Sequence, residues 1–204
     1  MKIISYNVNG FRAAFTKDFL GWLKVANPDV ICIQESKAGN DQIDIESLQQ
    51  NGYFSYWHSA QKKGYSGVGI ASKIAPKHIE IGCGIESYDN EGRIMRADFE
   101  NFSVLSVYVP SASNIERLDF KMEFCEDFLK DVEFDTLICT GKSTQMVNDV
   151  MEGQPNKKYL NFEGKDIKEV ERALYKESQN ALIFCVGNIH GPGKEIAQYI
   201  EGIK

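Results

Sequence analysis

The 204-residue sequence contains no apolar run of about 18 residues, which is the length that a bilayer-spanning helix needs. The N-terminal stretch also lacks the pattern of a secretory signal peptide, because Asn7, Asn9 and Arg12 interrupt its apolar residues. Five cysteines are present, but no two of them have the Cys-x-x-Cys spacing of a zinc or redox site. These absences predict a reduced, cytoplasmic protein that has neither disulfides nor structural zinc.

An excess of basic charge is also missing. The formal net charge is −6, and residues 1–135 hold 14 Lys and Arg against 20 Asp and Glu, while residues 136–204 hold nine of each sign. A protein that coats DNA without sequence preference needs a basic surface, so the overall charge disfavours that class. A local basic rim around a site is still possible, and its candidates are Lys62, Lys63, Arg93, Arg96 and Arg117.

Two glycine-containing segments fall short of a nucleotide-binding loop. Gly141-Lys142-Ser143-Thr144 would need a glycine where Thr136 stands, so a phosphate loop is excluded there. A second segment could still cradle an anion with its backbone amides, or could simply be a tight turn between close-packed elements. Its residues of interest are Gly187, Asn188, Gly191 and Gly193.

Hydrophobic periodicity predicts an α/β protein with mixed sheets. In the first part we expect helices at 16–26, 43–50 and 114–131, strands at 2–6, 29–33, 53–58, 78–82, 94–99 and 102–109, a loop entering a strand at 63–72, and hairpin-like turns at 90–92 and 100–101. From about residue 135 a smaller β-α-β-α-β-α rhythm predicts a Rossmann-like unit with strands at 136–140, 157–162 and 181–186 and helices at 143–152, 166–178 and 194–202. The predicted domains are therefore residues 1–135 and 136–204.

Polar side chains stand at the ends of three predicted strands. Asn7 and Glu35 each follow an apolar run, and Tyr108 closes another run just before a proline. Oxygen ligands at neighbouring strand ends could hold a hard divalent cation. The plainer alternatives are that Asn7 caps a turn, Glu35 is solvated and Tyr108 packs in the core.

Five ordered segments resemble the exonuclease III / apurinic-apyrimidinic endonuclease family, which has the endonuclease-exonuclease-phosphatase fold. They are Ser5–Gly10 with Arg12-Ala13, Pro28–Lys37 with its Ile-Gln-Glu-Ser-Lys end, Lys63–Val68, Glu91-Gly92-Arg93, and Tyr108-Val109-Pro110 followed by Arg117. The resemblance implies a two-sheet sandwich between helices. Because the family normally takes its second sheet from its other half, we expect only a partial sandwich, with an apolar sheet face left to be covered.

The resemblance also implies roles and partners. Glu35 would bind Mg²⁺ (or Mn²⁺) with Asn7 beside it, Tyr108 would contact the scissile phosphate, and Arg117, Arg93 and Lys63 would contact the DNA backbone. The implied reaction is metal-assisted phosphodiester hydrolysis, and the implied substrate is double-stranded DNA with an abasic site.

The family pattern fails after residue 138. Its Gly-Asp-Phe-Asn is replaced by Thr140-Gly141-Lys142-Ser143, and its closing Ser-Asp-His is absent, since His190 lies between Ile189 and Gly191. The tail is instead similar to the C-terminal end of poly-gamma-glutamate synthases, which belong with the Mur-type ligases. Three functions stay open: an impaired nuclease, a silent relative that binds metal or DNA, and a fusion that carries a synthase fragment.

Overall fold

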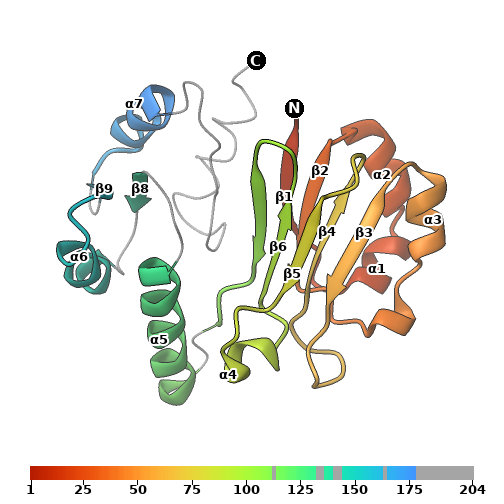
Figure 1. Cartoon of the computed structure of the whole chain (residues 1–204), viewed down its shortest axis with the longest axis horizontal. Coiled ribbons are helices and arrows are strands. Elements are labelled where there is room, and N and C mark those ends of the chain that lie inside the picture. Colours follow the sequence, from red (N-terminus) through yellow and green to blue (C-terminus); the bar gives the residue numbers. More distant parts are fainter. Residues whose placement is uncertain (112–113, 132–135, 140–143, 163–164, 178–204) are drawn as a thin grey trace. The chain divides into compact units, whose positions relative to one another are not determined.

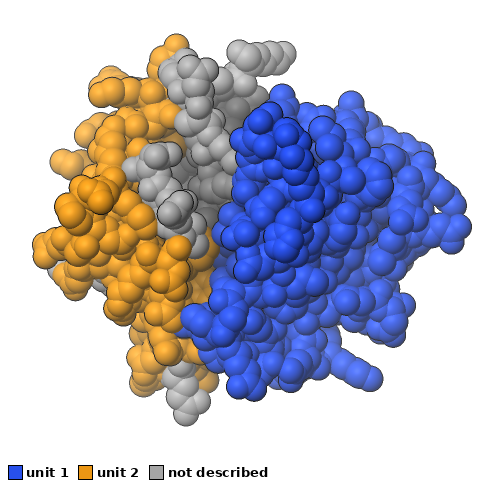
Figure 2. All heavy atoms as spheres, in the orientation of Figure 1, with its two compact units in different colours: residues 1–108 blue, residues 109–204 orange. Residues whose placement is uncertain are grey.

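The computed structural model describes residues 1–111, 114–131, 136–139, 144–162 and 165–177. The chain divides into two compact units, Met1–Tyr108 and Val109–Lys204 (Figure 2). Each unit is treated by itself below. The domain boundary predicted near residue 135 falls inside the second unit, and it stays a prediction.

The first unit is built on a mixed four-stranded sheet, as the sequence predicts. Its strands are ordered β1-β2-β4-β3, with bounds Ile3–Asn7, Val30–Gln34, Val68–Ser72 and Phe54–His58. β1 pairs in parallel with β2, whereas β4 runs antiparallel to both β2 and β3. Every residue of β2 and β4 is buried, which explains their nearly continuous apolar sequences.

Three helices cover one face of this sheet, namely α1 (Phe11–Thr16), α2 (Phe19–Ala26) and α3 (Ile45–Gln50) (Figure 1). Phe11, Leu23 and Leu48 from these helices pack with Ile31 and Ile33 of β2. The single helix predicted at 16–26 was wrong at its start. Asp18 adopts a left-handed conformation with φ 63°, and its side chain accepts a hydrogen bond from the Gly21 amide, so that α1 ends and α2 begins around it.

A second sheet covers the opposite face. It is antiparallel, ordered β5-β6-β7, with bounds His78–Ile81, Ile94–Asp98 and Ser103–Val107. Met95 and Val104 of this sheet share a buried cluster with Cys32 and Ile70 of the first. The expectation of an uncovered apolar face was therefore wrong, because residues 78–107 supply the covering sheet themselves.

Only one of the two predicted hairpin turns is a tight turn. Between β6 and β7 the Phe99 amide donates to the Phe102 carbonyl over 2.8 Å, which closes the turn at 100–101. Residues 90–92 instead continue from the short helix α4 (Glu86–Asp89), with the Gly92 amide bonded to the Asp89 carbonyl. The link between β5 and β6 is thus helical rather than a hairpin turn.

The second unit contains α5 (Ile115–Asp131), β8 (Thr136–Cys139), α6 (Thr144–Glu152), β9 (Lys158–Asn161) and α7 (Ile167–Glu177). β8 and β9 pair in parallel, as predicted, and Leu129, Val147 and Met151 form a small buried cluster. The strand predicted at 181–186, the glycine-rich turn with Gly187, Asn188, Gly191 and Gly193, and the helix predicted at 194–202 all lie outside the described residues.

Cys32, Cys83 and Cys125 are free thiols. Across the described ranges, no helix combines the length and the apolar character that crossing a membrane demands.

Gly92 stands where the backbone favours a glycine. Its φ is +60°, and a Cβ there would lie 2.6 Å from the His58 carbonyl oxygen and 2.8 Å from the Ala60 amide nitrogen. Gly84 has a similar φ of +83°, but nothing would lie within 4 Å of its added Cβ. Only the first site thus combines an unfavourable backbone conformation with a backbone clash.

We expect Gly84→Ala to lower the free energy of unfolding by about 1–2 kcal/mol, the cost of a left-handed alanine. Gly92→Ala should cost about 1–3 kcal/mol more, because the main chain at 58–60 must move. Urea titrations of the two variants measure this difference. Equal midpoints would show that the segment 58–60 yields without strain.

Candidate active site

Asn7 and Glu35 meet at one edge of the first sheet. β1 and β2 are parallel, Asn7 is paired in register with Gln34, and Glu35 is the next residue. The carboxyl ends of parallel strands lie at the same edge, and the Asn7 Nδ2 donates to Glu35 Oε1 over 2.8 Å. The predicted proximity of these two side chains is confirmed.

Glu35 is surrounded by hydrogen-bond donors. Its side chain is 17% exposed, and its Oε2 lies 2.9 Å from the Lys37 Nζ. Burial raises the pKa of the Glu35 carboxyl, but hydrogen bonds from Asn7, Lys37 and the Tyr108 hydroxyl outweigh burial and hold this pKa below its usual value. Glu35 is therefore an ionised carboxylate at neutral pH.

The backbone that carries Glu35 is unusual. Glu35 and Lys37 adopt left-handed conformations with φ 54° and 48°, which are unfavourable for residues other than glycine. The Ser36 and Lys37 amides donate to the carbonyls of Gly67 and Ser66 over 3.1 and 2.8 Å, so the neighbouring loop fixes this turn. Such strained positions persist where the surroundings determine them, and they cluster at functional sites.

Tyr108 follows β7 and completes the cluster. Burial first, and then the hydrogen bond and the charge of Glu35, raise the pKa of the Tyr108 phenol. The phenol therefore stays neutral and donates a hydrogen bond to the Glu35 carboxylate. Asn7, Glu35 and Tyr108 thus form one cluster within the first unit.

The three residues predicted to contact DNA lie in different surroundings. Arg93 is only 1% exposed and pairs with Glu91, so direct contact between its guanidinium and a phosphate is not supported. Lys63 is exposed beside a hollow of about 100 Å³ that Lys62 and Tyr65 also line. Arg117 belongs to α5 of the second unit, where its guanidinium lies 4.5 Å from the centre of the Phe120 ring, and its contact with DNA stays a prediction.

The described side chains offer a divalent cation only a sparse site. Within the described ranges, no three His, Cys, Asp or Glu side chains gather closely enough to hold a metal ion. One carboxylate still suits Mg²⁺, which keeps most of its waters and is often held by one or two carboxylates. Glu35 therefore fits a largely hydrated Mg²⁺, provided that the cation replaces the Lys37 ammonium on Oε2.

Sequence reasoning missed the residues that organise this cluster. Lys37, Tyr65 and Glu91 lie within the recognised segments, yet none was assigned a role. The sequence signal that could have identified these residues was their position inside those segments. Their contacts with Glu35 and Arg93 depend on the tertiary structure and had no sequence signal of their own.

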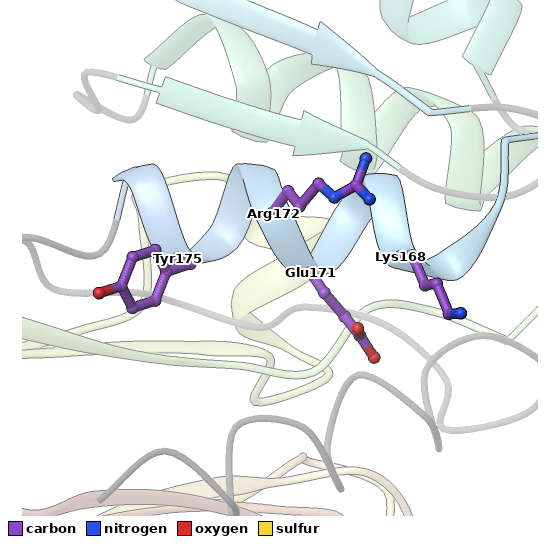
Figure 3. Close-up of a pocket in the computed structure, with 4 residues that line it drawn as sticks. All are labelled: Lys168, Glu171, Arg172 and Tyr175. Carbon is purple, nitrogen blue, oxygen red and sulfur yellow. The ribbon is translucent and has the colours of Figure 1, made fainter.

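A separate hollow lies along α7 (Figure 3). It is lined by Lys168, Glu171, Arg172 and Tyr175, which follow one helical face at intervals of three and four residues. Val170 and Leu174 are the buried residues of α7. These features describe the polar side of an amphipathic helix and offer no catalytic arrangement.

Known proteins match the two parts of the chain separately. The exodeoxyribonuclease of Bacillus subtilis is 46% identical over 131 residues, which cover 63% of this chain and 51% of that protein. The DNA-(apurinic or apyrimidinic site) endonuclease of Dictyostelium discoideum is 36% identical over 125 residues, covering 60% of this chain and 34% of that protein. The structure of an AP endonuclease from Archaeoglobus fulgidus superposes with a TM-score of 0.58 at 29% identity, covering 65% of this chain and 52% of that one.

The resemblance to exonuclease III and AP endonucleases is confirmed. The fold of the exonuclease III-like part is accordingly that of the endonuclease-exonuclease-phosphatase enzymes. The chain spans about half the length of the B. subtilis relative.

The tail matches a different family. Residues 116–203 match the model of the poly-gamma-glutamate synthase CapB C-terminal domain, as the sequence of the tail predicted. This match begins upstream of residue 135, within α5.

Proposed function

We propose that this chain is a Mg²⁺-dependent phosphodiesterase of the exonuclease III type, acting on double-stranded DNA at abasic sites, with an activity impaired because the second half of the family's active site is not found in the sequence. The cluster of Asn7, Glu35 and Tyr108 at one edge of the first unit carries this proposal. The names of its relatives support the substrate class, because they are DNA-repair nucleases.

The side chains divide the work as follows. Glu35 would hold Mg²⁺, and Mn²⁺ could replace it, while the Asn7 amide orients the carboxylate through Oε1. When bound there, the cation would supply positive charge to neutralise the phosphate oxygens during hydrolysis. The neutral Tyr108 phenol can turn its proton from Glu35 to a phosphate oxygen, and exposed Lys63 adds positive charge near the same loops.

Two groups of a complete family member have no counterpart in the sequence. The Asp of Gly-Asp-Phe-Asn is replaced at Thr140–Ser143, and the closing Asp-His pair is absent. The second candidate is therefore a catalytically silent relative that binds metal or DNA. It is favoured because the described site has one carboxylate, and no three His, Cys, Asp or Glu side chains gather there to hold a metal ion. A fusion that carries a poly-gamma-glutamate synthase fragment is the third, supported by the match over residues 116–203.

Incision of a duplex oligonucleotide with one abasic site tests the proposal. We expect slow nicking by the purified 204-residue chain with Mg²⁺ or Mn²⁺, none with EDTA, and none on the intact duplex. Binding of the abasic duplex without nicking at any Mg²⁺ concentration would favour the silent relative. A chain that neither binds nor nicks the abasic duplex would favour the fusion. Separately, the cytoplasmic location remains a prediction from the cysteine pattern.

A further inference from the structure

Arg93 is the largest fully buried side chain of the first unit, and all three of its nitrogens are paired. Its Nε and Nη2 each lie 2.6 Å from Glu91 Oε2. Its Nη2 also donates to the Tyr65 hydroxyl over 3.0 Å, and its Nη1 donates to the Tyr108 carbonyl over 2.8 Å. A buried guanidinium is tolerated only when it is paired and hydrogen-bonded in this way.

Arg93 restrains Tyr108 through three separate contacts. Besides the bond from Nη1, the Tyr108 amide donates to the Arg93 carbonyl over 2.9 Å. The guanidinium carbon also lies 5.0 Å from the centre of the Tyr108 ring, within the range of a cation–π interaction. These contacts hold both the backbone and the ring of Tyr108 in place, just past the end of β7.

Stability alone does not account for a buried charge here. Well-packed apolar residues usually replace a buried ion pair without loss of stability, so such a pair needs another reason to persist. The fork of Arg93 joins Glu91 and Tyr65 on one side to Tyr108 on the other. Tyr108 in turn donates to Glu35, the carboxylate at the centre of the cluster.

We propose that Arg93 is a positioning residue, which, with Glu91 and Tyr65, fixes the ring of Tyr108 against Glu35. The catalytic part of this role rests on the proposed function, whereas the geometric part does not. A lysine cannot replace Arg93, because one ammonium group cannot reach Glu91, the Tyr65 hydroxyl and the Tyr108 carbonyl in the planar arrangement of a guanidinium.

Tyrosine labelled with ¹³C at Cζ reports this geometry by NMR, in the free chain without Mg²⁺ or DNA. Tyr108→Phe assigns the Tyr108 signal. Tyr53 is the internal control, because it is 4% exposed in the core and its hydroxyl donates to the Pro28 carbonyl. We expect Arg93→Met and Arg93→Lys to shift the Tyr108 signal, while the Tyr53 signal stays in place.

An unchanged Tyr108 signal in either folded variant would overturn the positioning role. If Arg93→Met does not fold, Arg93→Lys and Tyr65→Phe decide the question, since the second removes only the Tyr65 hydroxyl, which accepts from Arg93 and donates to Glu91 over 3.5 Å. Wherever the wild-type chain nicks abasic DNA, Arg93→Lys should lower kcat about tenfold and leave KM within about twofold, as a loss of orientation does. A wild-type chain that never nicks would overturn the proposed function, and the Tyr108 signal would still judge the positioning role.

Discussion

Glu35→Gln should abolish the Mg²⁺-dependent cleavage of abasic DNA, with a fall in kcat/KM of about 10²–10³-fold or more, the usual scale for losing charge stabilisation at a reacting phosphate. The amide keeps the size of the side chain and can still accept from Asn7, but it carries no charge to hold the cation. Mg²⁺ titration followed by NMR of the free chain would show the loss of binding directly.

Glu86→Gln is the matched control. Glu86 is an exposed carboxylate in the first turn of α4, and it takes no part in the cluster. Its substitution should leave both Mg²⁺ binding and cleavage at the wild-type level. Full cleavage by Glu35→Gln would mean that the cation, if it is needed at all, binds elsewhere.

Turnover by this chain on abasic DNA should lie several orders of magnitude below that of the exodeoxyribonuclease of B. subtilis, its 46% identical relative. General acid-base assistance is worth about 10²–10⁴ in rate, and the groups that would supply it are missing from the sequence. Because groups that act together do not contribute additively, the combined loss is smaller than the product of the separate losses.

Single-turnover rates of both proteins on one abasic duplex measure this difference. Lys142→Ala, a substitution outside the described residues, should leave the rate of this chain unchanged. A rate within about tenfold of that of the relative would reveal a substitute for the missing Asp and His. The reason is that a difference of about tenfold is smaller than the rate loss expected from any single acid-base group. Asp149, Asn188 and His190 would be the first candidates to replace.

The parts of the fold that local sequence determines were predictable. The apolar runs of β1 and β2 and the polar residues that end them located Asn7 and Glu35, because strand ends in a parallel pair share an edge. The break between α1 and α2 was missed, since it depends on the left-handed conformation of Asp18. That conformation is a property of one residue, and periodicity does not report it.

Contacts between distant segments were not predictable in the same way. An apolar face of the first sheet was expected to be left uncovered because the chain departs from the family after residue 138, yet Met95 and Val104 of the second sheet pack against β2 and β4. Arg93 was assigned to DNA by resemblance, whereas its partners Tyr65 and Tyr108 lie far away in sequence and bury it. A sequence motif identifies such an arginine, but only the packing shows which way its guanidinium faces.

The ion pair of Lys37 with Glu35 has a consequence for how the chain acquires its cation. The ammonium serves as a built-in counter-ion, so the partly buried Glu35 carboxylate has a charged partner without a bound cation. Folding of the polypeptide would then not require a metal ion, unlike that of a zinc finger, which folds only when its metal binds. Mg²⁺ would bind and dissociate reversibly as a cofactor of an already folded protein. A chelator would remove Mg²⁺ from the site without unfolding the chain.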